Sequence, residues 1–175
     1  MDSLPMDHQR LVDFLTDDET SLLGKQYFLM RLEEEFKKSW RHGWSLSLIV
    51  VEIEGLEAIR ENDGEHAYKQ AVLGISGELL SASRDTDLSS RLDTKRFAVV
   101  LPGTDEVGAH AFVDRVLRNI IEGAFGQLTM AIGGTAAPQE GLTSTDEFIA
   151  RAATGVDLAR GKGTNEFVFW SAPSR

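Results

Sequence analysis

The sequence of 175 residues contains no cysteine. Without a thiol, the chain has no disulfide bonds, cysteine-ligated zinc, iron–sulfur clusters or cysteine nucleophile. No apolar run approaches the ~20 residues that a membrane-spanning helix needs. The first residues also lack a basic stretch followed by an apolar one, which would be typical of a secretory signal. We therefore expect a soluble, cytoplasmic protein.

Positive charge is also scarce: 28 acidic residues face 18 lysines and arginines, and the formal net charge is -10. Such a balance opposes broad binding to nucleic acid or to an anionic membrane, because both depend on a positive surface. A compact anionic ligand held by a few local arginines is still allowed. With 42% hydrophobic residues, the chain is long enough to form one domain that buries roughly 70% of its unfolded surface.

Hydrophobic periodicity predicts alternating helices and strands. We expect helices over residues 21–43, 64–81, 105–122 and 145–160, and strands over 45–54, 87–92, 97–101, 128–132 and 166–170. Residues 1–16 form a lead-in helix or a linker, residues 17–171 the domain and residues 172–175 a tail. This order predicts an α/β fold around a central sheet, and the strand over 45–54 is expected to be buried on both faces.

The predicted hairpin carries a recognisable pattern. Residues 91–102, RLDTKRFAVVLP, resemble the signature hairpin of GGDEF domains, the diguanylate cyclase family. The GGDEF letters are replaced by Asp93-Thr94-Lys95-Arg96-Phe97. Further motifs of the family are similar to residues 20–28, 52–54, 130–133 and 152–165, in the right order. The resemblance implies a mostly antiparallel central sheet flanked by helices, as in nucleotide cyclases, over about residues 17–170.

The residues at the family's metal positions are altered. Active relatives use two carboxylates to coordinate magnesium over GTP, and these positions match Glu52 and Lys95, with Arg96 beside the latter. A lysine ammonium has no lone pair for a metal and repels it. We therefore expect no metal ion, no magnesium cofactor and no catalytic residue.

The substrate-binding positions are altered as well. Asp93 and Thr94 replace the two glycines that let the substrate approach the turn. The positions that read guanine match Arg60 and Lys69, which cannot accept hydrogen bonds from its edge. Arg160 is compatible with the family's phosphate-binding lysine. Since phosphoryl transfer depends on positioning and metal electrostatics, the resemblance implies a degenerate domain without diguanylate cyclase activity.

Two interpretations of the altered positions are open. They form a changed nucleotide pocket with Glu52 and Glu54, or they are charges on a solvated rim. The second is favoured, with some of the basic residues paired to Glu52 or Glu54. The residues in question are Arg60, Lys69, Lys95 and Arg96.

The sequence also resembles a second site of the family. Arg84-Asp85-Thr86-Asp87 matches the R-x-x-D motif that binds the product, cyclic di-GMP, and Arg115 matches an additional arginine of that site. An arginine binds phosphate bidentately or stacks on guanine, and an aspartate accepts from the guanine edge. An isolated R-x-x-D is also common as a solvated Arg–Asp pair. Arg91 is a further candidate, or a strand-edge residue.

We therefore expect an inactive domain that binds cyclic di-GMP and signals to an unidentified protein partner, with ligand-driven homodimerisation as a corollary. The alternative is a protein–protein interaction module that binds no nucleotide. Residual enzyme activity on GTP is a third hypothesis. The four histidines, at positions 8, 42, 66 and 110, have no spacing typical of metal ligands.

Overall fold

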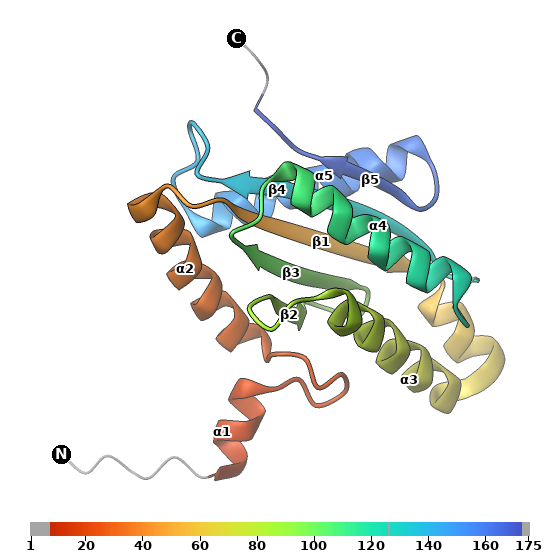
Figure 1. Cartoon of the computed structure of the whole chain (residues 1–175). Helices are drawn as coiled ribbons and strands as arrows, with labels where there is room; N and C mark the ends of the chain where they lie inside the picture. The colour runs from red at the N-terminus through yellow and green to blue at the C-terminus, as the bar shows by residue number, and fades with distance from the viewer. Residues whose placement is uncertain (1–7, 126, 173–175) are drawn as a thin grey trace.

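The computed structural model describes residues 8–125 and 127–172. The helices are α1 His8–Leu15, α2 Lys25–His42, α3 Leu56–Ala82, α4 Glu106–Glu122 and α5 Thr145–Lys162. The strands are β1 Leu46–Glu54, β2 Leu88–Arg91, β3 Arg96–Pro102, β4 Thr129–Ala137 and β5 Glu166–Phe169. They form one sheet in the order β2-β3-β1-β4-β5 (Figure 1). Within the described ranges, no helix is long and apolar enough to cross a membrane.

Strand β1 lies at the centre of this sheet. It pairs antiparallel with both β3 and β4, β2 pairs antiparallel with β3, and only the β4–β5 pair is parallel. The predicted α/β fold with a mostly antiparallel sheet is therefore confirmed. Burial on both faces of β1, which its β-branched and leucine run predicted, is also confirmed for all residues except Glu54.

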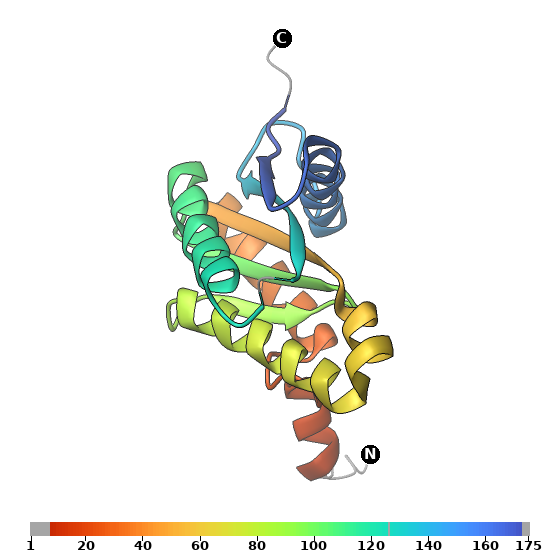
Figure 2. The ribbon, with the colours of Figure 1, turned by 90° about the vertical axis from the view of Figure 1, so that its right-hand side faces the viewer.

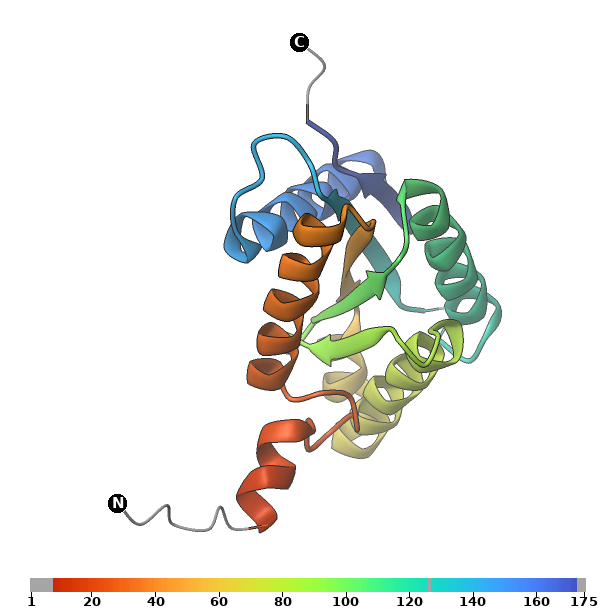
Figure 3. The ribbon, with the colours of Figure 1, turned by 60° about the vertical axis from the view of Figure 1, so that its left-hand side comes forward.

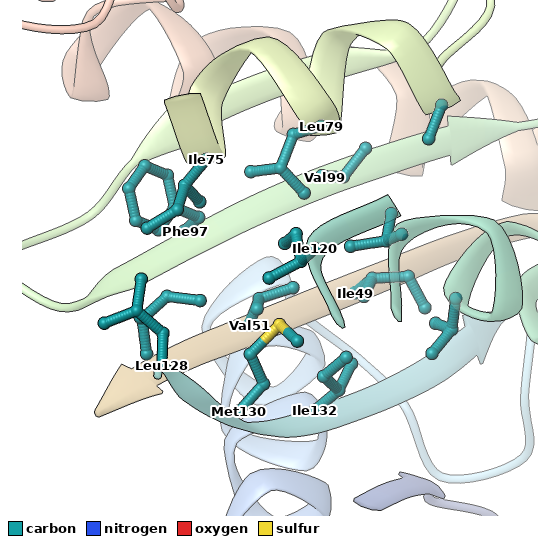
Figure 4. Packing of buried hydrophobic residues seen from close by; sticks show 14 of the residues in the cluster. Ile49, Val51, Ile75, Leu79, Phe97, Val99, Ile120, Leu128, Met130 and Ile132 are labelled. Atoms are coloured by element: carbon teal, nitrogen blue, oxygen red, sulfur yellow. The ribbon is translucent and has the colours of Figure 1, made fainter. Parts of the chain in front are cut away.

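Helices cover both faces of the sheet. Alternate residues of β1 point to opposite sides, so that Ile49 and Val51 pack with α3 and α4, while Leu48 and Val50 pack with α2 and α5. Figure 2 shows α4 and α5 on opposite sides of the sheet. In the close-up of Figure 4, Ile75 and Leu79 of α3 lie over Phe97 and Val99 of β3. The result is a three-layer sandwich with two hydrophobic cores.

The N-terminal helix α1 lies beside the start of α2 (Figure 3), where the rings of Phe14 and Tyr27 are 5.9 Å apart. The segment that joins α1 to α2 covers the outer edge of β2, because Leu23 N–H donates to Ser89 O at 3.0 Å. Residues 1–7 of the predicted lead-in and 173–175 of the predicted tail lie outside the described residues.

Three predicted boundaries differ from the structure. Helix α2 begins at Lys25 and not near residue 21. Helix α3 begins at Leu56, but Gly64, with φ 90° and ψ 174°, joins two helical segments within it, so the predicted helix from Gly64 is the second segment and only the first was missed. Strand β4 continues to Ala137, beyond the predicted end at residue 132, through Gly133 and Gly134. A Cβ on Gly133 would stand 2.0 Å from Ala152 O, so the close approach of α5 requires glycine there. The end of β4 was missed because its small residues have low strand propensity, and the helix that packs against them could not be known from the sequence.

Candidate functional site

The signature hairpin carries Lys95 and Arg96 to the end of β1. The Asp93 carboxylate caps the turn by accepting from Lys95 N–H at 3.0 Å and Arg96 N–H at 2.9 Å. Arg96 begins β3 and lies opposite Glu52 in the register with β1. Asp93 therefore stabilises the turn locally, and the turn brings two basic side chains to Glu52.

Glu52 is the centre of a cluster of ion pairs. Its side chain is fully buried, and Oε2 accepts from Arg96 Nε at 2.8 Å. Oε1 accepts from Arg160 Nε at 3.0 Å and also from Arg160 Nη2, while Lys95 Nζ lies 3.8 Å from it. Burial by itself would raise the pKa of Glu52, but the hydrogen bonds from Arg160 and Arg96 outweigh it and hold the pKa below its ordinary value. Glu52 is thus ionised and neutralised by side chains.

The surrounding charges complete this Glu52 cluster. Lys95 Nζ lies 3.1 Å from Glu54 Oε1, and Arg160 Nη1 lies 3.0 Å from Asp157 Oδ1. Three cations therefore face three carboxylates. Among the described residues, no group of three or more His, Asp or Glu side chains could hold a metal ion. Because guanidinium groups occupy both oxygens of Glu52, the residues present do not fit the magnesium ion that the fold implies.

The two predicted guanine positions, Arg60 and Lys69, both lie on α3. Arg60 Nη1 is 2.8 Å from Glu57 Oε1, Arg60 Nε is 3.0 Å from Glu65 Oε2, and its guanidinium lies 3.7 Å from the centre of the Tyr68 ring. Lys69 is exposed. The structure therefore pairs Lys95 and Arg96 with Glu52 and Glu54, and pairs Arg60 with its own helix.

The side chains of Arg84, Asp87 and Arg115 lie together at the other end of β2. The Arg84 backbone N–H donates to Asp87 Oδ2 at 2.7 Å, and Arg115 Nη2 donates to Ala82 O at 3.1 Å. Burial raises the pKa of Asp87 above its ordinary value, and the Arg84 backbone hydrogen bond with the charges of Arg84 and Arg115 opposes that rise only in part. We call these three residues the RxxD cluster.

The RxxD cluster contains one unsatisfied oxygen and one exposed cation without a hydrogen bond. Asp87 Oδ1 is shielded from solvent and accepts no hydrogen bond from any described residue. The Arg84 guanidinium is exposed and makes no hydrogen bond or ion pair within residues 8–125 and 127–172. An acceptor without a donor and an exposed cation are therefore adjacent.

Arg91 does not belong to this cluster. Its guanidinium is largely buried against Tyr68, donating to the phenol oxygen at 2.7 Å and to Thr94 O at 2.7 Å, and it also pairs with Glu19. It therefore joins the signature turn to the segment before α2. Arg91, Arg60 and Thr94 line one side of a hollow of about 280 Å³.

Sequence reasoning missed several partners of these residues. The pairing of Glu57 with Arg60 was detectable, because residues three apart on a helix are neighbours. The contacts of Arg91 with Glu19 and Tyr68 had no sequence signal, since the residues come from separate elements.

The fold is thus that of an α/β nucleotide-cyclase-like domain. The family described as "Diguanylate cyclase, GGDEF domain" matches residues 14–166. The chain belongs to the GGDEF-domain family.

Similar proteins from other organisms agree with the assignment to the GGDEF-domain family. The chain is 30% identical over 102 residues to the diguanylate cyclase DgcP of Pseudomonas aeruginosa, a match over 58% of this chain and 15% of that protein. It is 23% identical over 112 residues to the probable diguanylate cyclase DgcC of Escherichia coli, over 63% of this chain and 30% of that protein. The matches therefore span less than a third of the length of these relatives.

Solved structures share the fold. The GGDEF domain of DgcB from Caulobacter crescentus in complex with c-di-GMP has a TM-score of 0.83 at 15% identity, over 90% of this chain and 96% of that one. The diguanylate cyclase SiaD of Pseudomonas aeruginosa, solved with its activator SiaC, has a TM-score of 0.79 at 24% identity, over 92% and 64%. At these identities the likeness establishes the fold alone.

Proposed function

We propose that this domain is a catalytically inactive GGDEF domain that acts as a cytoplasmic receptor for cyclic di-GMP through Arg84, Asp87 and Arg115. The observation that carries the proposal is the unpartnered Asp87 Oδ1 beside two guanidinium groups. A shielded acceptor without a donor costs about 1–3 kcal/mol. A ligand that donates to it relieves that cost.

Cyclic di-GMP has the chemistry that this cluster lacks. Its guanine N1–H and amino group are neighbouring donors for the Asp87 carboxylate. Its phosphates are anions for the Arg84 guanidinium, and its base faces are stacking surfaces for either arginine. Each charge-assisted contact contributes about 1.5–3 kcal/mol, so that three contacts with stacking reach micromolar affinity, about 8 kcal/mol. The DgcB domain solved with c-di-GMP supports this ligand class for the fold.

The loss of cyclase activity is proposed from the Glu52 cluster. Both carboxylate oxygens of Glu52 accept hydrogen bonds, one from Arg96 and the other from Arg160. A metal would have to displace two guanidinium groups, and the second carboxylate that it needs is Lys95. Without the metal, the charge that develops on a transferring phosphoryl group is not stabilised.

The receptor then signals to a protein partner. A ligand bound at the RxxD cluster alters the surface near β2 and α4, and an intercalated pair of ligand molecules would bridge two domains as a ligand-driven dimer. The complex of SiaD with SiaC is a precedent for a protein bound to a GGDEF protein. The alternative function is an interaction module that binds no nucleotide, which the self-contained Glu52 cluster favours.

Titration calorimetry with cyclic di-GMP tests the proposal. We expect binding with a dissociation constant in the micromolar range, about 8 kcal/mol. Arg84→Ala should abolish it, because that guanidinium is the free cation of the cluster. Arg41→Ala is the matched control, since Arg41 is exposed near the end of α2, on the face of the sheet opposite α4, and should leave binding unchanged.

Two results would contradict the receptor. Absence of heat with the folded wild-type protein at tens of micromolar ligand would favour the interaction module. Equal heat from wild type and Arg84→Ala would place the ligand elsewhere. Production of cyclic di-GMP from GTP and magnesium would contradict the proposed inactivity.

A further inference from the structure

The outer side of α2 carries a stripe of exposed residues in which two opposite charges lie between two apolar side chains. Met30, Glu33, Lys37 and Trp40 follow one another at intervals of three and four residues, so they share one side of the helix. Met30 is 46% exposed and Trp40 45% exposed. The side chains of Glu33 and Lys37, which lie between them, are 45% and 73% exposed. We call these four residues the α2 stripe.

A cavity of about 550 Å³ lies beside this stripe. It is lined by α2 and by the segment 142–145 that leads into α5. Its apolar lining includes Phe36, Trp40 and Leu142, and its polar lining includes Glu33, Lys37 and Thr145. Figure 3 shows α2 on the near side of the molecule with α5 beside it. Trp40 is thus a large apolar side chain that stays exposed at the rim of a hollow with apolar lining, which a partner's side chain would fill.

The order of residues in the stripe is self-complementary. The four positions are symmetric about residue 35, with an apolar residue at each end and opposite charges inside. If a second α2 lies antiparallel across a two-fold axis at that point, Met30 faces Trp40 of the other copy and Glu33 faces Lys37 of the other copy. A two-fold contact requires that each pair occurs twice, and this stripe meets that requirement.

We propose that the α2 stripe is a homodimer interface in which a second copy of this chain packs its α2 antiparallel against the first. Met30 of each copy then enters the cavity beside Trp40 and Leu142 of the other. Each dimer gains two Met–Trp contacts, which are favourable between a thioether and an aromatic ring, and two Glu–Lys contacts.

Local charge explains why a second copy fits. The net charge of -10 opposes self-association over most of the surface, but the stripe contains one acid and one base and is neutral. Within one copy Glu33 Oε1 lies 3.2 Å from Lys37 Nζ, and Thr145 Oγ1 donates to Glu33 Oε2 at 2.8 Å. These bonds hold the two charges in place before a partner arrives. The interface lies apart from the RxxD cluster, so the dimer needs no ligand.

Complementary charge reversals give a direct test by sedimentation in the absence of cyclic di-GMP. The wild type should show a reversible monomer–dimer equilibrium. Glu33→Lys makes both central positions basic, and Lys37→Glu makes both acidic, so each variant alone should dimerise about tenfold more weakly, because two attractive contacts become repulsive. An equimolar mixture of the two variants should dimerise again, since every basic position then meets an acidic one.

The mixture separates the proposal from its rivals. Mixing two folded variants changes no contact within either chain, so recovered dimerisation can come only from contacts between copies. Glu34→Lys and Lys38→Glu are matched controls, because they make the same charge changes off the stripe. The mixture of these two variants should dimerise no more strongly than either variant alone. A wild type that stays monomeric over about three orders of magnitude in concentration overturns the proposal. So does a mixture that associates no more than its components.

Discussion

The Glu52 cluster and the RxxD cluster both combine acidic and basic side chains, but they use them in opposite ways. At Glu52 every carboxylate oxygen receives a hydrogen bond from the chain itself. At Asp87 one oxygen is left without a donor, and the neighbouring Arg84 guanidinium is exposed and makes no hydrogen bond or ion pair with the described residues. The first region has satisfied its polar groups internally, and the second retains groups that a ligand can satisfy.

The titration behaviour of the two carboxylates reflects the same difference. Burial opposes ionisation of both, but two guanidinium groups outweigh it at Glu52, and the pKa of that side chain is lowered. At Asp87 burial prevails over the nearby positive charges, and its pKa is raised. A carboxylate with a raised pKa is incompletely compensated, which is typical of a site that performs a function at some cost in stability.

The largest expected effect concerns the stability of the Glu52 cluster. Glu52→Gln leaves Arg96, Arg160 and Lys95 without their shared counter-charge, and we expect it to lower the free energy of unfolding by about 2–3 kcal/mol, less than for a fully buried pair because the cations are partly exposed. Urea denaturation measures this change. The matched control is Glu54→Gln, where the side chain is 50% exposed and the effect should be below about 0.5 kcal/mol. Equal effects would show that burial of Glu52 is not what distinguishes it.

The next effect concerns ligand affinity at the RxxD cluster. Arg115→Ala should weaken the binding of cyclic di-GMP by about ten- to a hundredfold, the equivalent of one charge-assisted contact. Calorimetry measures the affinity, and Arg160→Ala serves as the comparison because Arg160 belongs to the other region. If Arg160→Ala weakened binding and Arg115→Ala did not, the roles of the two regions would be reversed.

A smaller effect separates the two regions by pH. Since the pKa of Glu52 is lowered on folding, its contribution to stability is full above its unfolded pKa near 4.3 and is lost as the pH falls through its folded value. For Asp87 the sign is opposite: the ionised side chain costs stability at neutral pH, and the cost disappears as the pH falls through its raised pKa. Asp87→Asn should therefore be more stable than wild type at pH 7, with an advantage that vanishes in acid. A variant less stable than wild type at pH 7 would argue against the raised pKa.

The smallest expected effect is a null result at the former metal position. Magnesium should leave the melting temperature of the protein unchanged, because both oxygens of Glu52 are already occupied. Differential scanning fluorimetry with magnesium and with an equal ionic strength of sodium measures this. If magnesium alone raised the melting temperature, and Glu52→Gln removed this effect, a metal ion would displace the guanidinium groups from Glu52.

Much of the fold followed from local pattern. The apolar run of β1, the helical spacing in α2 and α4, and Gly43 as the end of α2 each have a local physical cause, and each was predicted from it. The early start of α3 and the full length of β4 were missed. In both cases glycines carry a conformation or a close approach that only the packed partner explains.

The sequence by itself determined which residue types stand at each position, and Lys95 at the position where the resemblance implies a second magnesium carboxylate predicts a domain without that metal. It also determined that the residues of the α2 stripe share one side of a helix, since the neighbours along a helix are fixed by its geometry. Only the tertiary structure decided that Arg160, 108 residues from Glu52, neutralises it, and that Arg91 turns toward Tyr68 and away from the RxxD cluster. Such pairings depend on which elements pack against each other. A charge that this packing buries must be neutralised by a partner, whatever the distance between the two residues in the sequence.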